Sequence, residues 1–207
     1  MLERIVAGLA HHPLQLLQPP QKRSAAVLIG LFGNPADPEI LLTQRAFHLR
    51  SHSGQVAFPG GMWEADDGSL LDTALRESHE EVALLPANVN PFATLPTSRT
   101  RFGVSVTPYV AVLDQDEFRP EEGELEAVFQ APVSFFLDKA NLTQFDYAIG
   151  DASVSMPCYW YFDFCIWGHT LAMLVEMLNQ AVAADIRLKY PAPEVVAEFR
   201  ARTEVDQ

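Results

Sequence analysis

The stretch ALRESHEEVAL, residues 74–84, places three glutamates, Glu77, Glu80 and Glu81, within five positions. In a helix, which turns by about 100° per residue, Glu80 lies about 60° to one side of Glu77 and Glu81 about 40° to the other. A mostly apolar face lies beside them, at about 100° to 160° from Glu77, and consists of Leu71, Leu75, Ser78 and Val82. The sequence from Ser69 to Leu85 therefore predicts a helix with an acidic stripe beside its buried face, ended by Pro86.

A glycine pair precedes this helix, in FPGG, residues 58–61, and the acidic loop MWEADDG, residues 62–68, follows it. Glycines after a strand adopt backbone conformations closed to other residues and let a ligand approach closely. Two interpretations of the acidic stripe stay open here. In the first interpretation the stripe is a solvated surface, since like charges at i,i+4 cost only about 0.2–0.5 kcal/mol per pair. Alternatively it holds Mg²⁺ or Mn²⁺, which bind carboxylates, water and substrate phosphates.

Strand-like and helix-like segments are mixed along the rest of the chain. SAAVLIGLF, residues 24–32, and EILLTQRA, residues 39–46, are strand-like and predict a hairpin across the turn GNPADP. QVAFPGG, residues 55–61, begins as a further strand. Other strands are expected at 92–96, 104–113, 142–148 and 154–164, and other helices at 132–138, 167–184 and 193–202. These segments predict an α/β (α+β) fold, a mixed β-sheet sandwiched between α-helices.

The predicted domain organisation is simple. Residues 1–23 are expected to form an N-terminal helix and linker, residues 24–190 the main domain, and residues 191–207 a C-terminal helix or tail.

The overall charge limits the partners. Lys and Arg number 14 against 27 acidic residues, a formal net charge of −13, so we expect binding to neither nucleic acid nor anionic membranes. We find no signal peptide, and acidic and histidine residues interrupt the most apolar window, residues 159–178, which favours a cytoplasmic location. Cys158 and Cys165 are too few for a disulfide framework and are expected to be small buried residues.

Gly61, five residues, Asp67, eight residues and then RESHEEVAL, residues 76–84, resemble the Nudix box. The general pattern is glycine, five residues, glutamate, seven residues, Arg-Glu, an aliphatic, any residue, Glu-Glu, any residue, glycine and an aliphatic. This chain departs from it at Asp67, in the longer second spacer, at Ser78 and at Ala83. The central Arg-Glu and Glu-Glu are intact.

A second resemblance lies just upstream. LLTQRAFHLRSHSGQVAFPGG, residues 41–61, looks like the signature of the coenzyme A diphosphatase branch of Nudix hydrolases. The longer spacer and the aspartate at position 67 are also typical of that branch. Downstream, GELEAVFQAPVSFFL and FCIWGHTLAMLVEML resemble its acidic loop and its final helix.

The resemblance implies a Nudix fold and a metal-dependent hydrolase with Mg²⁺ or Mn²⁺ as cofactor. By resemblance, the substrate is the small molecule coenzyme A, or an acyl derivative, which water splits into 3′,5′-ADP and 4′-phosphopantetheine or its acyl derivative. The alternatives are a Nudix hydrolase for another nucleoside diphosphate derivative, such as ADP-ribose or a dinucleotide, and an inactive Nudix-fold nucleotide-binding module. Loss of box glutamates would mark the inactive module, and here all three are present.

The carboxylates receive their roles from this resemblance. Glu77 and Glu81 stand at i,i+4 and can converge on one ion; Glu80 and Glu124 are the further metal ligands that we expect. Glu77, Glu80 and Glu124 are the candidate catalytic residues, and Glu124 is either a ligand or the base that activates water. Glu121 and Glu122 stand behind Glu124 as candidates, and an exposed acidic loop without function is the alternative for residues 121–126.

An acidic protein that binds an anionic substrate needs local positive charge. Five arginines lie between the second strand and the loop PTSRTRFG, with His48 and His52 among them: Arg45, Arg50, Arg76, Arg99 and Arg101. Arg45 and Arg50 are predicted to bind phosphate, including the 3′-phosphate of coenzyme A, with Gly60 and Gly61 close to the substrate. Arg76 contacts phosphate or braces a glutamate, and the resemblance favours bracing. Phe58, Pro59 and Asp67 are predicted structural supports.

Two further groups are given structural roles. The spacing of His48, His52 and His79 does not suit a zinc site, so they are interpreted as structural or substrate-adjacent. The aromatic residues between 159 and 167 are interpreted as core or as a subunit interface through which a homodimer could form.

Overall fold

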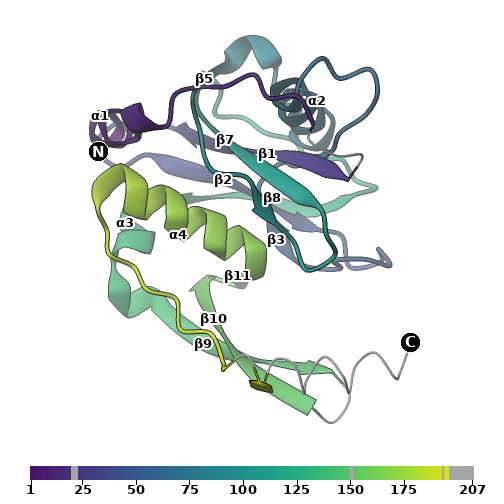
Figure 1. The fold of residues 1–207 in the computed structure, drawn as a ribbon, viewed down its shortest axis with the longest axis vertical. Coiled ribbons are helices and arrows are strands. Elements are labelled where there is room, and N and C mark those ends of the chain that lie inside the picture. The colour runs from purple at the N-terminus through teal and green to yellow at the C-terminus, as the bar shows by residue number, and fades with distance from the viewer. Residues whose placement is uncertain (20–22, 150–151, 193, 196–207) are drawn as a thin grey trace.

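The computed structural model describes residues 1–19, 23–149, 152–192 and 194–195 (Figure 1). Within these ranges, one sheet has eight strands in the order β3-β2-β1-β7-β5, with β4 beside β1, β6 beside β7 and β8 beside β2. Its strands are β1 (Ser24–Phe32), β2 (Glu39–Arg45), β3 (Val56–Ala57), β4 (Gly60–Met62), β5 (Val89–Thr94), β6 (Ser98–Arg99), β7 (Ser105–Leu113) and β8 (Leu125–Pro132). A second, three-stranded sheet contains β9 (Leu142–Ile149), β10 (Ala152–Tyr161) and β11 (Phe164–Trp167). The α-helices are α1 (Leu2–Gly8), α2 (Leu70–Val82), α3 (Val133–Leu137) and α4 (Gly168–Val182).

The large sheet is mixed, as predicted. β1 pairs parallel with β7 and antiparallel with β2, where Leu31 is opposite Ile40. Side chains alternate along β1 between two hydrophobic clusters. Ala25, Ile29 and Leu31 pack with residues of α4, whereas Ala26, Leu28 and Phe32 pack with residues of α2. The near-continuous apolar run is therefore a strand buried on both faces, and Figure 1 shows α2 and α4 on opposite sides of the sheet.

Helix α2 has both of its ends defined by local interactions. The Ser69 hydroxyl accepts a hydrogen bond from the Asp72 amide at 3.2 Å, which satisfies a donor of the first turn. At the other end Ala83 adopts the left-handed conformation, φ 56°, and the Ala83 and Leu84 amides donate to the carbonyls of His79 and Ser78. The predicted helix over 69–85 is thus confirmed, with its last turn shorter than expected.

Several other predicted elements are confirmed and some are wrong. The hairpin over 24–46, the strand at 104–113 and the helices at 132–138 and 167–184 correspond to elements of the structure. The strand expected at 92–96 begins earlier, at Val89, and the one expected at 154–164 is two strands joined by a turn. No strand was predicted over 125–132, where β8 pairs with β2. The helix expected at 193–202 lies outside the described residues, except for 194 and 195.

The aromatic segment contributes both to the core and to the surface. Tyr159 is fully buried and donates a hydrogen bond to the Phe136 carbonyl at 2.8 Å, whereas Phe162, in the turn between β10 and β11, is 81% exposed. A homodimer through this segment stays a prediction. In the parts of the chain that the structure describes, no helix combines the length and the apolarity that a membrane crossing requires.

Candidate active site

The bend between β3 and β4 brings the backbone to the acidic face of α2. Gly60 has φ 149°, and a side chain there would overlap the backbone of Ala26 and Val27. Only glycine fits this conformation and this close approach to β1. The preceding residues hold the bend, since Phe58 is buried and the Pro59 carbonyl accepts a hydrogen bond from the Leu28 amide at 2.8 Å. Phe58 and Pro59 therefore support the bend from the sheet side.

Glu81 is the most buried carboxylate at the bend. Its residue is 5% exposed, and its Oε2 accepts a hydrogen bond from the Gly60 amide at 3.0 Å. Burial raises the pKa of Glu81 to about 7, and the neighbouring charges of Glu77 and Glu124 act in the same direction. The Gly60 amide and Arg45 oppose this rise. Without an added cation, the Glu81 carboxyl is therefore only partly ionised at neutral pH.

Glu77 lies against the second glycine of the pair. A methyl group at Gly61 would overlap the Glu77 carboxylate, so the absence of a side chain at 61 makes room for it. Burial raises the pKa of Glu77, Arg76 lowers it, and Glu80 and Glu124 raise it further. The two carboxylates predicted to be the main metal ligands thus both lie at the glycine pair.

Arg76 and Asp67 form a hydrogen-bonded pair beside these glutamates. Arg76 donates from Nε and Nη2 to the two carboxylate oxygens of Asp67 at 2.9 and 3.0 Å. Its Nη1 contacts Glu77 and Glu80, each at 3.1 Å, and its Nη2 also donates to the Met62 carbonyl. The Arg76 guanidinium holds the pKa of Asp67 below its usual range. Arg76 therefore directs its donors to protein oxygens, a geometry suited to positioning carboxylates.

The remaining glutamate of the stripe is more accessible. The Glu80 side chain is 57% exposed and its contact with Arg76 is an i,i+4 ion pair. It is the most exposed of the three glutamates in the stripe.

Glu124 reaches the site because its loop is attached to the end of α2. The amides of Arg119 and Glu121 donate to the carbonyls of Val82 and Glu81, at 3.1 and 2.9 Å, which satisfies acceptors that the last helical turn leaves unpaired. The Glu124 carbonyl accepts from the Ala46 amide at 2.9 Å. Glu124 is exposed, and its charge acts on both Glu77 and Glu81. Glu121 instead accepts a hydrogen bond from the Gly123 amide within the loop, at 2.8 Å.

The two arginines predicted to bind substrate occupy different positions. Arg45 ends β2, its charge acts on Glu81, and its buried Nε has no hydrogen-bond partner in the protein. Arg45 also lines a cavity of about 370 Å³ beside β3. Arg50 is exposed in the turn after β2 and does not line that cavity.

The sequence did not single out most of the other residues around this cavity. They come from widely separated segments and include Thr100, Tyr147, Trp167 and His169. No local spacing connects residues so far apart. The sequence pointed to Arg101, His52 and the aromatic residues up to 167, but nothing in it placed them at one cavity.

The donor types suit a hard divalent cation, although the structure holds no preformed cage. Among the described residues, no three carboxylate, imidazole or thiolate side chains are close enough together to form a metal centre by themselves. Glu77 and Glu81 nevertheless combine carboxylate oxygens, burial and mutual repulsion, which a cation would relieve. Mg²⁺ generally binds one or two carboxylates, with water and substrate phosphates as its other ligands. These residues therefore fit such an ion.

Fold and site together define a class of protein: a mixed α/β domain in which helix carboxylates face a glycine bend, an arrangement suited to metal-assisted hydrolysis of phosphoric anhydrides. Comparisons with known proteins identify the family. The NUDIX domain model matches residues 21–150, and the chain belongs to the Nudix family. It is a Nudix hydrolase, and the family acts on pyrophosphate bonds of nucleoside diphosphate derivatives, generally with divalent ions such as Mg²⁺ or Mn²⁺.

Two relatives that are about 40% identical to this chain carry the same family name. The chain is 40% identical over 165 residues to the uncharacterized Nudix hydrolase NudL of Shigella flexneri serotype 5b, covering 79% of this chain and 85% of the relative. It is 41% identical over 160 residues to the protein of that name from Escherichia coli strain SMS-3-5, covering 76% and 82%.

Solved structures support the fold. The Nudix hydrolase RenU of M. smegmatis superposes with a TM-score of 0.55 at 17% identity, covering 81% of this chain and 90% of that one. A MutT/nudix family protein from Enterococcus faecalis gives 0.51 at 17% identity, covering 82% and 66%.

Proposed function

We propose that this Nudix hydrolase cleaves the diphosphate of coenzyme A or acyl-coenzyme A. The observation that carries the proposal is the position of the stretch 41–61, which resembles the coenzyme A diphosphatase signature. This one segment supplies Gly60 and Gly61 beneath the carboxylates, and Arg45, His52 and Gln55 in the wall of the adjoining cavity. It therefore contributes both to the reacting centre and to the space available for the rest of a substrate.

Glu77 and Glu81 are the proposed metal ligands, with Glu80 as a further ligand. A bound Mg²⁺ or Mn²⁺ would neutralise charge on the diphosphate and lower the pKa of an attacking water. The glycine pair lets the bend lie close to β1 and to the Glu77 carboxylate, and the proposed position of the diphosphate is beside these carboxylates. Arg76, held by its bonds to Asp67, keeps Glu77 in place, and Arg45, whose buried Nε has no hydrogen-bond partner in the protein, is the proposed cation for phosphate.

Glu124 is the proposed proton acceptor for the attacking water. It is exposed, its charge acts on Glu77 and Glu81, and it belongs to a loop that the backbone bonds to α2 hold in place. In the proposed reaction the water oxygen bonds to one phosphorus, the bridging P–O bond breaks, and the products are 3′,5′-ADP and 4′-phosphopantetheine.

Product analysis tests the substrate directly. Purified protein is incubated with coenzyme A, acetyl-coenzyme A, ADP-ribose and NADH, with and without Mn²⁺, and the products are separated by chromatography. We expect metal-dependent release of 3′,5′-ADP from the coenzyme A substrates. Cleavage of ADP-ribose or NADH without cleavage of coenzyme A would instead assign the enzyme to another nucleoside diphosphate derivative.

A further inference from the structure

The cavity beside β3 has walls from four separate parts of the chain. The turn after β2, the loop of residues 100–102, the β9–β11 sheet and the start of α4 all contribute to its volume of about 370 Å³. Val56 and Ala57 of β3 also line it, and β3 leads through Phe58 and Pro59 directly to the Gly60–Gly61 bend. Arg45 lines the cavity and its charge acts on Glu81, so the cavity adjoins the carboxylates, and a ligand with its diphosphate at the bend is placed to extend into it.

The wall formed by the small sheet is aromatic and apolar. The rings of Tyr147 and Trp167 lie 4.8 Å apart between centroids, and Val154 and Met156 line the same space. Both aromatic residues are partly exposed. Flat aromatic groups such as nucleobases bind well on surfaces of this kind because every base has a π-face.

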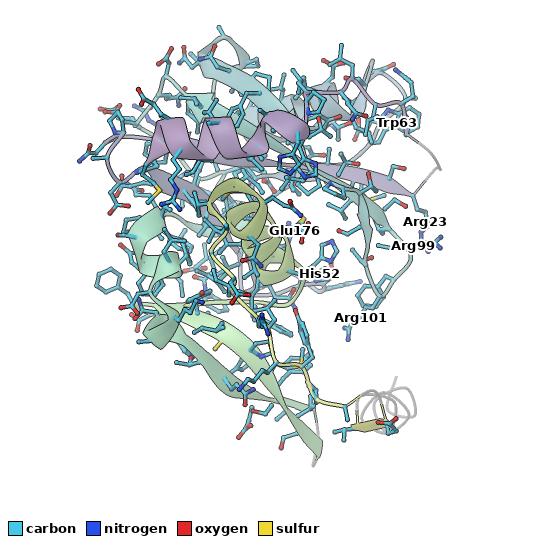
Figure 2. All side chains as sticks on the ribbon, turned by 60° about the vertical axis from the view of Figure 1, so that its left-hand side comes forward. Arg23, His52, Trp63, Arg99, Arg101 and Glu176 are labelled. Atoms are coloured by element: carbon cyan, nitrogen blue, oxygen red, sulfur yellow. The ribbon has the colours of Figure 1, made fainter. Side chains whose placement is uncertain are left out.

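Another part of the cavity wall, the loop of residues 100–102, carries positive charge. Arg101 lies over the Phe102 ring, 4.5 Å from its centroid, and His52 meets the same ring edge-on at 5.9 Å. Figure 2 shows Arg23, Arg99 and Arg101 on the same side of the molecule, and Arg23 donates to the Phe102 carbonyl at 3.4 Å. Of these three arginines only Arg101 lines the cavity, where Arg45 is the other arginine, in a chain of net charge −13. A cationic patch on an acidic protein selects for an anionic group at that place.

The loop that carries Arg101 is held in position by hydrogen bonds. The Thr100 amide donates to the Val104 carbonyl at 2.8 Å, and the Gly103 amide donates to the Thr100 carbonyl at 3.0 Å. Just before the loop, Ser98 Oγ and His169 Nε2 form a hydrogen bond of 3.0 Å that connects β6 to the start of α4. The cation is thus presented by a braced turn, which limits the entropy lost when a ligand binds.

We propose that this cavity binds the 3′-phosphoadenosine half of the substrate, with the base against Tyr147 and Trp167 and the 3′-phosphate at Arg101. The inference rests on the proposed function, because it assumes a substrate with a nucleoside 3′-phosphate. It assigns separate roles to the arginines: Arg45, which lies near Glu81, serves the diphosphate, and Arg101, at the aromatic rim, serves the 3′-phosphate. The pantetheine arm then extends from the bend away from this cavity.

Binding of the nucleotide product tests the cavity without requiring catalysis. The affinities of 3′,5′-ADP and of 5′-AMP are measured by titration calorimetry for the intact chain and for Arg101→Ala, Tyr147→Leu and Arg187→Ala. Wild type should bind 3′,5′-ADP about tenfold more tightly than 5′-AMP, and Arg101→Ala should abolish that difference. Tyr147→Leu should weaken both nucleotides by about tenfold. Arg187→Ala is the matched control, since its 83% exposed side chain pairs with Asp185 outside the cavity.

The inference is overturned if wild type does not prefer 3′,5′-ADP, or if Arg101→Ala leaves the preference unchanged. It is also overturned if Arg101→Ala weakens 4′-phosphopantetheine instead, because the cavity would then hold the other half of the substrate. Unchanged binding of both nucleotides to Tyr147→Leu, in a protein that unfolds at the wild-type temperature, would contradict the placement of the base.

Kinetics separates this inference from the proposed function. If coenzyme A is cleaved, Arg101→Ala should raise KM for coenzyme A about tenfold and leave KM for dephospho-coenzyme A unchanged. If coenzyme A is cleaved and Arg101→Ala changes KM equally for coenzyme A and dephospho-coenzyme A, the cavity assignment is refuted and the proposed function is not. Conversely, the protein could prefer 3′,5′-ADP through Arg101 and yet not cleave coenzyme A. That result refutes the proposed function alone.

Discussion

Glu81 shows how a single side chain links the stability of the fold to the site. Burial raises its pKa to about 7, above the ordinary value of 4.5, so the folded protein favours the protonated form. Protonation of Glu81 therefore contributes to the free energy of unfolding. This contribution is fully present below pH 4.5 and is lost as the pH rises through 7. Metal-free wild type should therefore lose stability relative to Glu81→Gln between pH 5 and pH 8, by up to about 3 kcal/mol.

Chemical denaturation of both proteins in EDTA, at a series of pH values, measures this difference. The glutamine amide oxygen can still accept the Gly60 hydrogen bond, and titrating groups that do not interact with Glu81 cancel in the comparison. A difference in unfolding free energy that stays constant across this pH range would show that Glu81 titrates normally.

Glu77 is expected to matter for turnover more than for folding. Its carboxylate lies beside Gly61, at the place proposed for the diphosphate, and burial already disfavours its charge. We expect Glu77→Gln to lower kcat by at least about 100-fold, which corresponds to about 3 kcal/mol in the barrier, with little change in thermal stability. Glu176→Gln, at an exposed position of α4, is the control and should keep wild-type turnover (Figure 2). Near-normal activity of the Glu77 variant would exclude Glu77 from the reacting centre.

At the scale of elements, the ends of the two long helices share one unfavourable feature. Ala83 and Ala183 follow α2 and α4 with φ of 56° and 52°, a left-handed conformation in which a Cβ is strained. Replacing either alanine by glycine should raise the unfolding free energy by about 1 kcal/mol, because glycine removes the strain. Chemical denaturation of each variant measures the change.

Ala87, in a 3₁₀ turn with ordinary backbone angles, provides the opposite control. Ala87→Gly should destabilise the protein by roughly 0.5–1 kcal/mol, because there glycine only adds entropy to the unfolded chain. Destabilisation by all three substitutions would mean that the two helix ends are not strained.

The elements also show where sequence reasoning succeeded and where it failed. β1 and α2 were predictable because their apolar residues follow the period of a strand or a helix over many positions. β8 was missed because its acidic beginning looks like a loop, although Leu125, Phe129 and Ala131 are buried at alternate positions. The turn between β10 and β11 was missed because Phe162 has φ 51°, a conformation that glycine or asparagine usually signals.

In the molecule as a whole, only the part of the site whose residues are close in sequence was predictable. The carboxylate stripe and the glycine pair are close in sequence, so their geometry follows from one helix and one bend. The cavity is different, because it depends on how the small sheet and the loop of residues 100–102 are placed against β3. Such placement is set by packing between distant segments, which no local pattern encodes.

The net charge of −13 and the buried glutamates together predict a large response to divalent cations. An ion that binds only the folded protein stabilises it by about 2.7 kcal/mol at 100 times its Kd. For a chain of this size, that corresponds to a rise in Tm of roughly 5–10 °C. Differential scanning fluorimetry with increasing Mn²⁺ or Mg²⁺ measures it.

A general effect of salt on an acidic protein must be separated from binding at the site. NaCl at matched ionic strength screens the same surface charges but supplies no ion that two carboxylates can hold. The combined Glu77→Gln and Glu81→Gln variant should therefore respond to Mn²⁺ no more than to NaCl, whereas wild type should respond several degrees more. Equal responses of wild type and variant to Mn²⁺ would place the cation elsewhere on the surface and would remove the two glutamates from the metal site.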